Sequence, residues 1–302
     1  MSFFHSIRRL VTDPPPGHVF EISPGGIAYG VPDEPQAPGF RALPEGVLAI
    51  SPLTDNVKEP EVFAEALAET FPQRGNKSLR PAVLILPDYA TRLQVLDFDT
   101  FPTKPEEQQA LVRFRMKKTV PFDIETAAVS FHPQLPVGDS KKVEVVAVLV
   151  AYEILGRYEQ PLREAGYHPG LVTTSSLATL NLLKKSSDKS LLVKISGKTV
   201  TLLALTGNRI RMSRCLELEV LSEEELLNLL YPTLAYMEDA FSDRHGSGRP
   251  TRIWLCGFGP DAAQMALRWT SDLETMVDVL QSRFGTPGSN NAGVLGYLES
   301  TN

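Results

Sequence analysis

Two segments of the chain repeat one outline, and this repeat constrains the fold more than any other feature. The first is Phe20-Glu21-Ile22-Ser23-Pro24-Gly25-Gly26, and the second is Val193-Lys194-Ile195-Ser196-Gly197-Lys198-Thr199. Each is a strand that enters a turn of small residues before a second apolar strand. Because the segments lie in opposite halves of the chain, they predict two like domains that face each other across a cleft. Each domain would offer a backbone-rich loop to a ligand phosphate.

Composition excludes several classes of protein. The 302 residues are enough for two domains of ordinary size, and the net charge of -6 lacks the basic excess of a nucleic-acid binder. No apolar run approaches the roughly 20 residues that cross a bilayer. The two cysteines, Cys215 and Cys256, form no close-spaced metal pair, and the five histidines lack ligand spacing. We therefore expect no metal site and a reducing, cytoplasmic compartment.

Residues 1–17 are expected to form a flexible or docking segment. They have no apolar core long enough for a secretory signal. A helix here would have apolar residues near one face and two arginines beside them: Phe3, Phe4, Ile7 and Leu10, with Arg8 and Arg9. The alternative is a frayed terminus that ends at the three prolines of residues 14–16.

Hydrophobic periodicity predicts alternating strands and helices along the rest of the chain. Strands are expected within 18–30, on both sides of the first turn, and at 47–50, 82–86, 93–98, 127–131, 142–151, 191–195, 200–205, 209–215 and 252–256, with a short extended stretch at 171–172. Residues 31–45 are expected to form a loop or hairpin. Helices are expected at 59–71, 105–118, 154–165, 175–183, 222–241 and 292–299, with a further helix after Gly259. Ser222 and Glu225 have the spacing of a capping box, and Pro232 predicts a kink.

The order of these elements resembles the actin-like ATPase superfamily, and within it the PilM-type proteins of type IV pilus assembly. Three segments carry the resemblance: the helix end at 114–122, the strand and helix at 148–169 that finish in Ala-Gly-Tyr-His-Pro, and the closing helix at 292–298. The resemblance implies a two-lobed α/β fold of the duplicated, ribonuclease H-like type. The lobes would be residues 18–175 and 176–302, with an inserted subdomain near 88–150 in the first lobe.

An actin-like site needs two turns whose N–H groups face the phosphates, carboxylates that hold magnesium, and a glycine-rich turn beside the nucleoside. The resemblance assigns weak nucleotide binding to ten positions of the three turns: Glu21, Ser23, Gly25, Gly26, Ser196, Gly197, Lys198, Thr199, Gly257 and Gly259. It assigns no catalytic residue.

Several residues depart from the family pattern. Glu21 is one methylene longer than the usual Asp, Pro24 has no N–H for a phosphate, and Lys194 stands where an Asp is expected. In the third turn, Phe258 lies between the two glycines. Together these changes argue against magnesium–ATP hydrolysis, so no cofactor and no enzymatic activity are expected.

Ordinary structural interpretations remain open beside this one. The turns could be plain hairpin tips, and Gly257 and Gly259 a tight strand-to-helix turn. Lys194 could be an outward-facing strand lysine paired with Glu217 or Glu219. Its functional alternative is a charge that replaces the metal or contacts phosphate.

The resemblance implies a scaffold on the cytoplasmic face of the inner membrane. It would bind the cytoplasmic tail of a single-span, PilN-like membrane protein and so belong to the platform of a type IV pilus or related type II secretion system. Four basic residues could contact an acidic partner or anionic lipid, or form a solvated helix face: Arg113, Arg115, Lys117 and Lys118. The competing hypothesis is an ATP-binding switch or a sugar-kinase-like phosphotransferase, for which Asp88, Asp97 and Asp99 are the nearby carboxylates.

Overall fold

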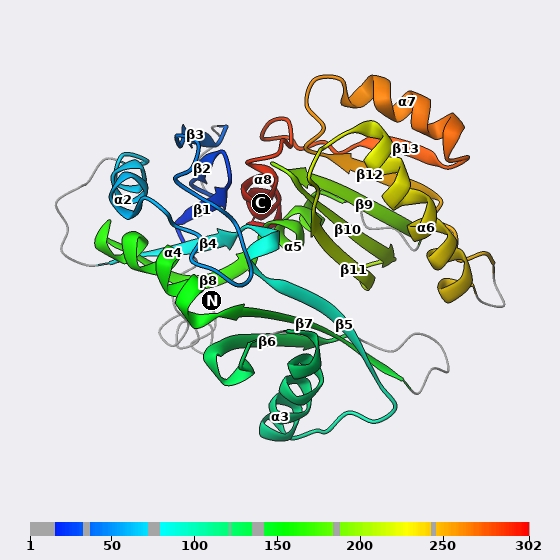
Figure 1. Cartoon of the computed structure of the whole chain (residues 1–302), viewed down its shortest axis with the longest axis horizontal. Coiled ribbons are helices and arrows are strands. Elements are labelled where there is room, and N and C mark those ends of the chain that lie inside the picture. Colours follow the sequence, from blue (N-terminus) through cyan, green and yellow to red (C-terminus); the bar gives the residue numbers. More distant parts are fainter. Residues whose placement is uncertain are drawn as a thin grey trace, which may run out of the picture.

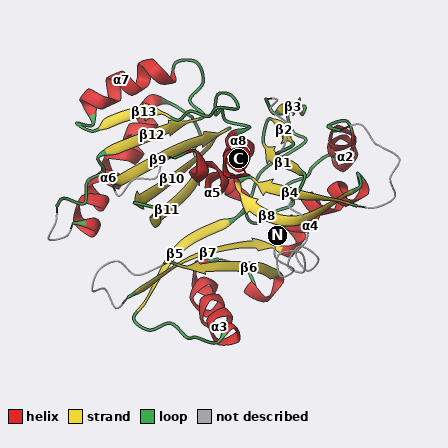
Figure 2. Cartoon of the chain, turned by 180° about the vertical axis from the view of Figure 1, so that it is seen from behind, coloured by secondary structure: helices red, strands yellow, loops and turns green. Residues whose placement is uncertain are grey.

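The computed structural model describes residues 16–32, 37–71, 79–120, 122–134, 142–183, 188–242 and 246–301. Most of the expected N-terminal docking segment therefore lies outside the described residues, as does Pro121. The described chain forms two five-stranded sheets and one three-stranded sheet, with helices on their faces (Figures 1 and 2). Within this part of the chain, no helix is both long and apolar enough to span a membrane.

The first sheet has the strand order β3-β2-β1-β4-β8. Its antiparallel meander is β1 (His18–Ser23), β2 (Gly26–Gly30) and β3 (Gly39–Ala42), and β1 also pairs in parallel with β4 (Arg80–Leu86), which pairs in parallel with β8 (Tyr167–Thr174). Helices α2 (Pro60–Ala68) and α4 (Tyr152–Glu164) cover one face. Phe20 and Ile22 of β1 point into that core, so Val19 and Glu21 belong to the opposite face.

The second sheet repeats this order as β11-β10-β9-β12-β13. The meander is β9 (Lys189–Ser196), β10 (Thr199–Thr206) and β11 (Arg209–Glu217), and the parallel strands are β12 (Arg252–Cys256) and β13 (Met276–Val279). Helices α6 (Glu223–Phe241) and α7 (Ala262–Asp272) cover the face to which Val193 and Ile195 point. Lys194 is therefore on the other face, as Glu21 is in the first sheet.

Helices α5 (Ser175–Thr179) and α8 (Ala292–Thr301) lie between the two sheets (Figure 1). A Cβ atom at Gly296 would lie 2.1 Å from the carbonyl oxygen of Ala178, so the two helices cross in close contact. Val294 and Leu298 of α8 pack on the first sheet, whereas Ala292 belongs to an apolar cluster on the second. The C-terminal helix thus joins the two lobes.

The third sheet is inserted between β4 and β8, after the short 3-10 helix η1 (Asp88–Ala90). Its strands are β5 (Arg92–Phe98), β7 (Val143–Ala151) and β6 (Ala127–Pro133), with helix α3 (Pro105–Met116) against one face through Val112 and Met116. The short 3-10 helices η2 (Lys117–Thr119) and η3 (Ile124–Thr126) join α3 to β6, and η4 (Leu180–Leu182) follows α5.

The expected elements are largely confirmed, with three differences. Residues 47–50 form no strand, because only Leu48 pairs with Val57, in an isolated bridge. The short edge strand β13 was not expected, and β8 extends well beyond the predicted stretch at 171–172. Both strands lie at sheet edges, where backbone pairing with the neighbouring strand forms them. The four residues of β13 are too few to show a clear periodicity. Helix α6 continues on both sides of Pro232.

Candidate functional site

The two repeated hairpins meet where the inner faces of the lobes come together. Gly197 has φ +58°, and a Cβ atom placed on it would lie only 3.2 Å from Cγ of Pro24. The Pro24 ring therefore lies close to the tip of the second hairpin. A phosphate group that lay between the tips would have to displace the Pro24 ring.

The first turn is tightly packed against residues of both lobes. A Cβ atom at Gly25 would lie 3.0 Å from the side-chain amide nitrogen of Asn290, just before α8. Gly26 has φ +150°, and a Cβ atom there would lie 2.2 Å from the carbonyl oxygen of Arg41. The Ser23 hydroxyl donates to the carbonyl oxygen of Gly26 at 3.0 Å. Local packing therefore explains these small residues without a ligand.

The carboxylate of Glu21 is buried against the two helices between the lobes. It accepts hydrogen bonds from the Ser175 hydroxyl of α5 and, at 2.8 Å, from the backbone N–H of Val294 in α8. Gly293 leaves room for it, since a Cβ atom there would lie 3.0 Å from Cδ of Glu21. Burial raises the pKa of Glu21 above its usual value, although Lys194 and both hydrogen bonds oppose this rise.

A buried ion pair joins the lobes beside Glu21. Nζ of Lys194 lies 3.0 Å from Oδ2 of Asp88, and these residues are only 1% and 7% exposed. Asp88 also accepts from the backbone N–H of Ser176 at 2.7 Å and from the Thr201 hydroxyl at 3.2 Å. Burial alone would lower the pKa of Lys194, but the carboxylates of Asp88 and Glu21 outweigh it and raise the pKa. Lys194 is therefore charged at neutral pH.

Four residues on neighbouring strands, Lys194 among them, form one row across the second sheet. The strand register pairs Cys215 with Thr201, Thr201 with Lys194, and Lys194 with Cys256. Burial, the largest influence, raises the pKa of both thiols to about 12. Since the thiolate is the reactive form, neither cysteine is suited to nucleophilic chemistry near neutral pH.

The expectation that Lys194 faces outward toward Glu217 or Glu219 is therefore wrong. Its strand alternates strictly, so the lysine must share the inner face with Leu192. A lysine buried this deeply needs a carboxylate, and Asp88 supplies it. Of the functional interpretations, a charge in place of the metal agrees with this geometry.

The third turn, after β12, also has a structural explanation. Gly257 has φ +86°, and a Cβ atom there would lie 2.2 Å from the carbonyl oxygen of Ile195. Phe258 packs edge-on against the Trp269 ring of α7, with 5.6 Å between centroids. Gly259 has φ +73° and no atom within 4 Å of a Cβ position. Of the two glycines in this turn, Gly259 is the one with enough open space beside it to approach a ligand.

The structure brings some expected residues together and separates others. The first two turns, with Gly257, converge on the Lys194–Asp88 pair; in the second turn Ser196 is half-buried, Lys198 is exposed and Thr199 is buried. Asp97 and Asp99 are exposed, and Asp97 belongs to the three-stranded sheet. Sequence reasoning missed Ser175, Ser176 and Thr201. The position of the two serines could have identified them. They follow β8 at the carboxyl edge of parallel strands, where ligand sites in α/β sheets are usually found.

The four basic residues of α3 and η2 have different surroundings. The Arg113 guanidinium donates to the carbonyl oxygens of Ile124 and Ala127 at 2.8 and 3.2 Å, so it stabilises the subdomain. The other three are exposed: Arg115 lies over the ring of Phe98, Lys118 lies near the ring of Phe114, and Lys117 lies between them in sequence.

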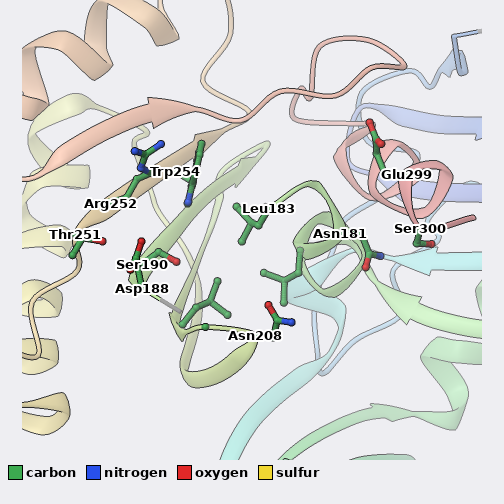
Figure 3. A pocket seen from close by; sticks show the side chains of 13 residues that line it. Asn181, Leu183, Asp188, Ser190, Asn208, Thr251, Arg252, Trp254, Glu299 and Ser300 are labelled. Atoms are coloured by element: carbon green, nitrogen blue, oxygen red, sulfur yellow. The ribbon is translucent and has the colours of Figure 1, made fainter. Parts of the chain in front are cut away.

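A cavity of about 760 Å³ lies away from the hairpin tips. It lies beside the first residues of β9 and β12 and the end of α8, with Trp254, Arg252 and Asn208 around it (Figure 3). Ser190 lines the cavity, whereas Lys194 is near the other end of the same strand. The cavity is therefore separate from the turns that the resemblance assigns to nucleotide.

No family model matches the chain, and no curated protein matches it. Solved structures do match. A chain of a PilM-PilN type IV pilus biogenesis complex superposes with a TM-score of 0.74 at 19% identity, over 96% of this chain and 99% of that one. A Bacteroides thetaiotaomicron protein of unknown function, described as having an actin-like ATPase fold, superposes with a TM-score of 0.51 at 11% identity, over 93% and 94% of the two chains. The expected fold class is thus confirmed: the chain has the two-lobed, actin-like α/β fold.

Proposed function

We propose that the chain is an actin-like scaffold of the inner-membrane platform that assembles a type IV pilus or a related type II secretion system. The observation that carries this proposal is the likeness to a chain of the PilM-PilN complex over nearly the full length of both chains. The scaffold would act on the cytoplasmic side of the membrane. Its partner would be the cytoplasmic tail of a PilN-like, single-span membrane protein.

The exposed side of α3 and η2 is the surface that we propose for this tail or for anionic lipid. Phe114 is 62% exposed and lies near Lys118, and Arg115 and Lys117 are exposed on the same segment. An aromatic ring among cations suits a peptide with carboxylates next to an apolar residue. Arg113 is left out of this surface because it already bonds two carbonyl oxygens.

We further propose that the protein hydrolyses no ATP. The Lys194 ammonium lies against Asp88, where a divalent cation would need carboxylate and water oxygens. The first and second turns are in contact with each other, and Pro24 offers no N–H to an anion. In the described part of the chain, no group of three or more His, Cys, Asp and Glu side chains could hold a metal ion.

The test is calorimetric titration of the purified chain with two kinds of ligand. Synthetic peptides covering the cytoplasmic tail of the PilN-like protein of the same organism should bind saturably, and scrambled peptides should not. Magnesium–ATP and ADP should produce neither heat nor a thermal shift at millimolar concentration. Saturable ATP binding would favour the switch or phosphotransferase hypothesis, and failure of every tail peptide would contradict the partner.

Charge reversal tests the proposed surface. The double variant Lys117→Glu/Lys118→Glu should weaken tail binding about tenfold or more, because two attractive charges become repulsive. Lys58→Glu is the matched control, since Lys58 is an exposed cation of the first lobe outside α3. Equal affinities for the two variants would place the tail elsewhere on the molecule.

A further inference from the structure

We propose that Lys194 is a built-in cation that holds the two lobes closed in every molecule, so that closure needs no nucleotide. Asp88 follows β4 of the first lobe, whereas Lys194 and Thr201 belong to β9 and β10 of the second. The Asp88 carboxylate therefore accepts hydrogen bonds from an ammonium and a hydroxyl of the other lobe. This conformational device does not depend on which partner the scaffold binds.

Burial makes this contact costly to break. Opening the lobes would leave the Asp88 carboxylate with only the Ser176 N–H among its present partners, and would leave the Lys194 ammonium without a carboxylate 3.0 Å away. A movement that separated the pair without admitting water would leave both charges desolvated and unpaired. The Pro24 ring lies close to Gly197 across the same boundary.

A second set of contacts restrains the lobes at the inserted subdomain. The Gln134 side chain accepts from the N–H of Ile210 and donates to its carbonyl oxygen, both at 2.8 Å. Glu144 lies 2.6 Å from Arg209 and 3.1 Å from Arg211. These contacts join the three-stranded sheet to strand β11 of the second lobe. Rotation of the lobes about α5 and α8 would have to disturb both sets.

A tethered cation changes how such a fold can be regulated. A ligand shifts a conformational equilibrium only through its different affinities for the two states. The Lys194 ammonium is present in every molecule and is charged at neutral pH, so it stabilises the closed state constantly. The position beside Asp88 is therefore occupied by Lys194 whether or not a nucleotide and metal are added.

Pulsed dipolar distance measurements test the proposal directly. Spin labels at Glu61→Cys on α2 and Leu267→Cys on α7 report the separation of the lobes, since both positions are exposed. Protein without the added cysteines measures any labelling of Cys215 and Cys256. The parent should show one narrow distance distribution that magnesium–ATP leaves unchanged. In Asp88→Asn/Lys194→Met, the distribution should broaden toward longer distances.

The paired variant keeps the test decisive if Lys194→Met alone fails to fold. It removes both charges of the ion pair together, and Glu21 keeps its hydrogen bonds from Ser175 and Val294. Modification of Cys256 by a thiol reagent gives a second measurement, because this residue is 1% exposed and pairs with Lys194 in the strand register. Its rate should rise at least about tenfold in the paired variant, which corresponds to a loss of about 1.4 kcal/mol against local opening.

Lys198→Met, an exposed change in the same hairpin, should alter neither measurement. A folded paired variant with the parent's narrow distances and slow Cys256 reaction would overturn the proposal. So would a parent protein whose lobe separation changes when magnesium–ATP is added.

Discussion

The two lobes are built on one plan and differ at the position that joins them. The strand orders β3-β2-β1-β4-β8 and β11-β10-β9-β12-β13 correspond strand for strand, so β1 matches β9 and β4 matches β12. At the same place in the matched hairpins, the first lobe has Glu21 and the second has Lys194, and both are buried on inner faces. Their partners differ. Glu21 bonds the helices between the lobes, whereas Lys194 bonds Asp88 of the other lobe.

This difference places one buried charge of each sign at the matched positions of the two hairpins. Two buried carboxylates near one another, such as those of Glu21 and Asp88, would repel each other and would require a cation beside them. One lysine in the second copy compensates that charge from within the chain. The repeat preserves the strand–turn–strand outline at these positions, and the charge is reversed in the second copy.

The largest expected effect is loss of the lysine. Lys194→Met should lower the free energy of unfolding by about 3–5 kcal/mol, because it leaves the Asp88 carboxylate buried without its cation. Urea unfolding followed by circular dichroism measures the change. Lys198→Met, in the same hairpin but exposed, should cost less than about 0.5 kcal/mol. A cost below about 1 kcal/mol for Lys194→Met would show that the two hairpins differ in sequence but not in energetic role.

The pH dependence of stability sharpens the same comparison. The pKa of Lys194 is raised in the folded protein above its ordinary value of 10.5. Its contribution is therefore fully present below that value and is lost as the pH rises through the folded pKa. The stability difference between the parent and Lys194→Met should stay constant from about pH 6 to pH 9 and shrink above pH 10.5. A difference that vanishes by about pH 9 would mean that burial outweighs the carboxylates.

The turns after the matched strands β4 and β12 give the next effect. The first lobe has Asp88 there, and the second has Gly257 against the carbonyl oxygen of Ile195. Gly257→Ala should cost about 3 kcal/mol or more, since a positive φ and a 2.2 Å contact both oppose the new Cβ atom.

Gly259→Ala is the control for this change, because Gly259 shares the positive φ but has open space. We expect it to cost about 1–2 kcal/mol in thermal or urea unfolding. Equal costs for the two variants would mean that the close packing after β12 is unimportant.

The smallest effect concerns the matched serines of the hairpins. Ser23→Ala removes a buried hydrogen bond of 3.0 Å to the carbonyl oxygen of Gly26 and should cost about 1 kcal/mol. Ser196→Ala, at the corresponding half-buried position, should stay within about 0.5 kcal/mol. Unfolding curves of the two variants measured together would show whether the first hairpin is the more tightly bonded one.

Much of the fold could be predicted from local patterns. The Ser222 side chain accepts from the N–H of Glu225 at the start of α6, as their spacing predicts, and Gly166 has φ +87° just after α4, where glycine commonly ends a helix. These features depend on neighbours within a few residues, and the sequence displays such neighbours directly. Strand β13 depends instead on pairing with β12, so its four residues carried too little pattern of their own.

The site was predicted less completely, because its chemistry depends on distant partners. The sequence shows that Glu21 and Lys194 occupy corresponding positions in the two hairpins. It does not determine whether Lys194 faces inward or faces Glu217 or Glu219. Nothing local distinguished Asp88 from Asp97 or Asp99. Only Asp88 lies where the carboxyl end of β4 meets the inner face of the second sheet.

The sequence by itself determined the repeat, the small-residue turns and the reversal of charge between the two hairpins. Each of these is a property of residues close together in the chain. The tertiary structure alone decided that Lys194 neutralises Asp88, which is 106 positions away. The physical reason is that such a pairing depends on how the two lobes pack against α5 and α8. Burial then makes the ion pair important for stability, because water cannot replace the lost partner of either charge.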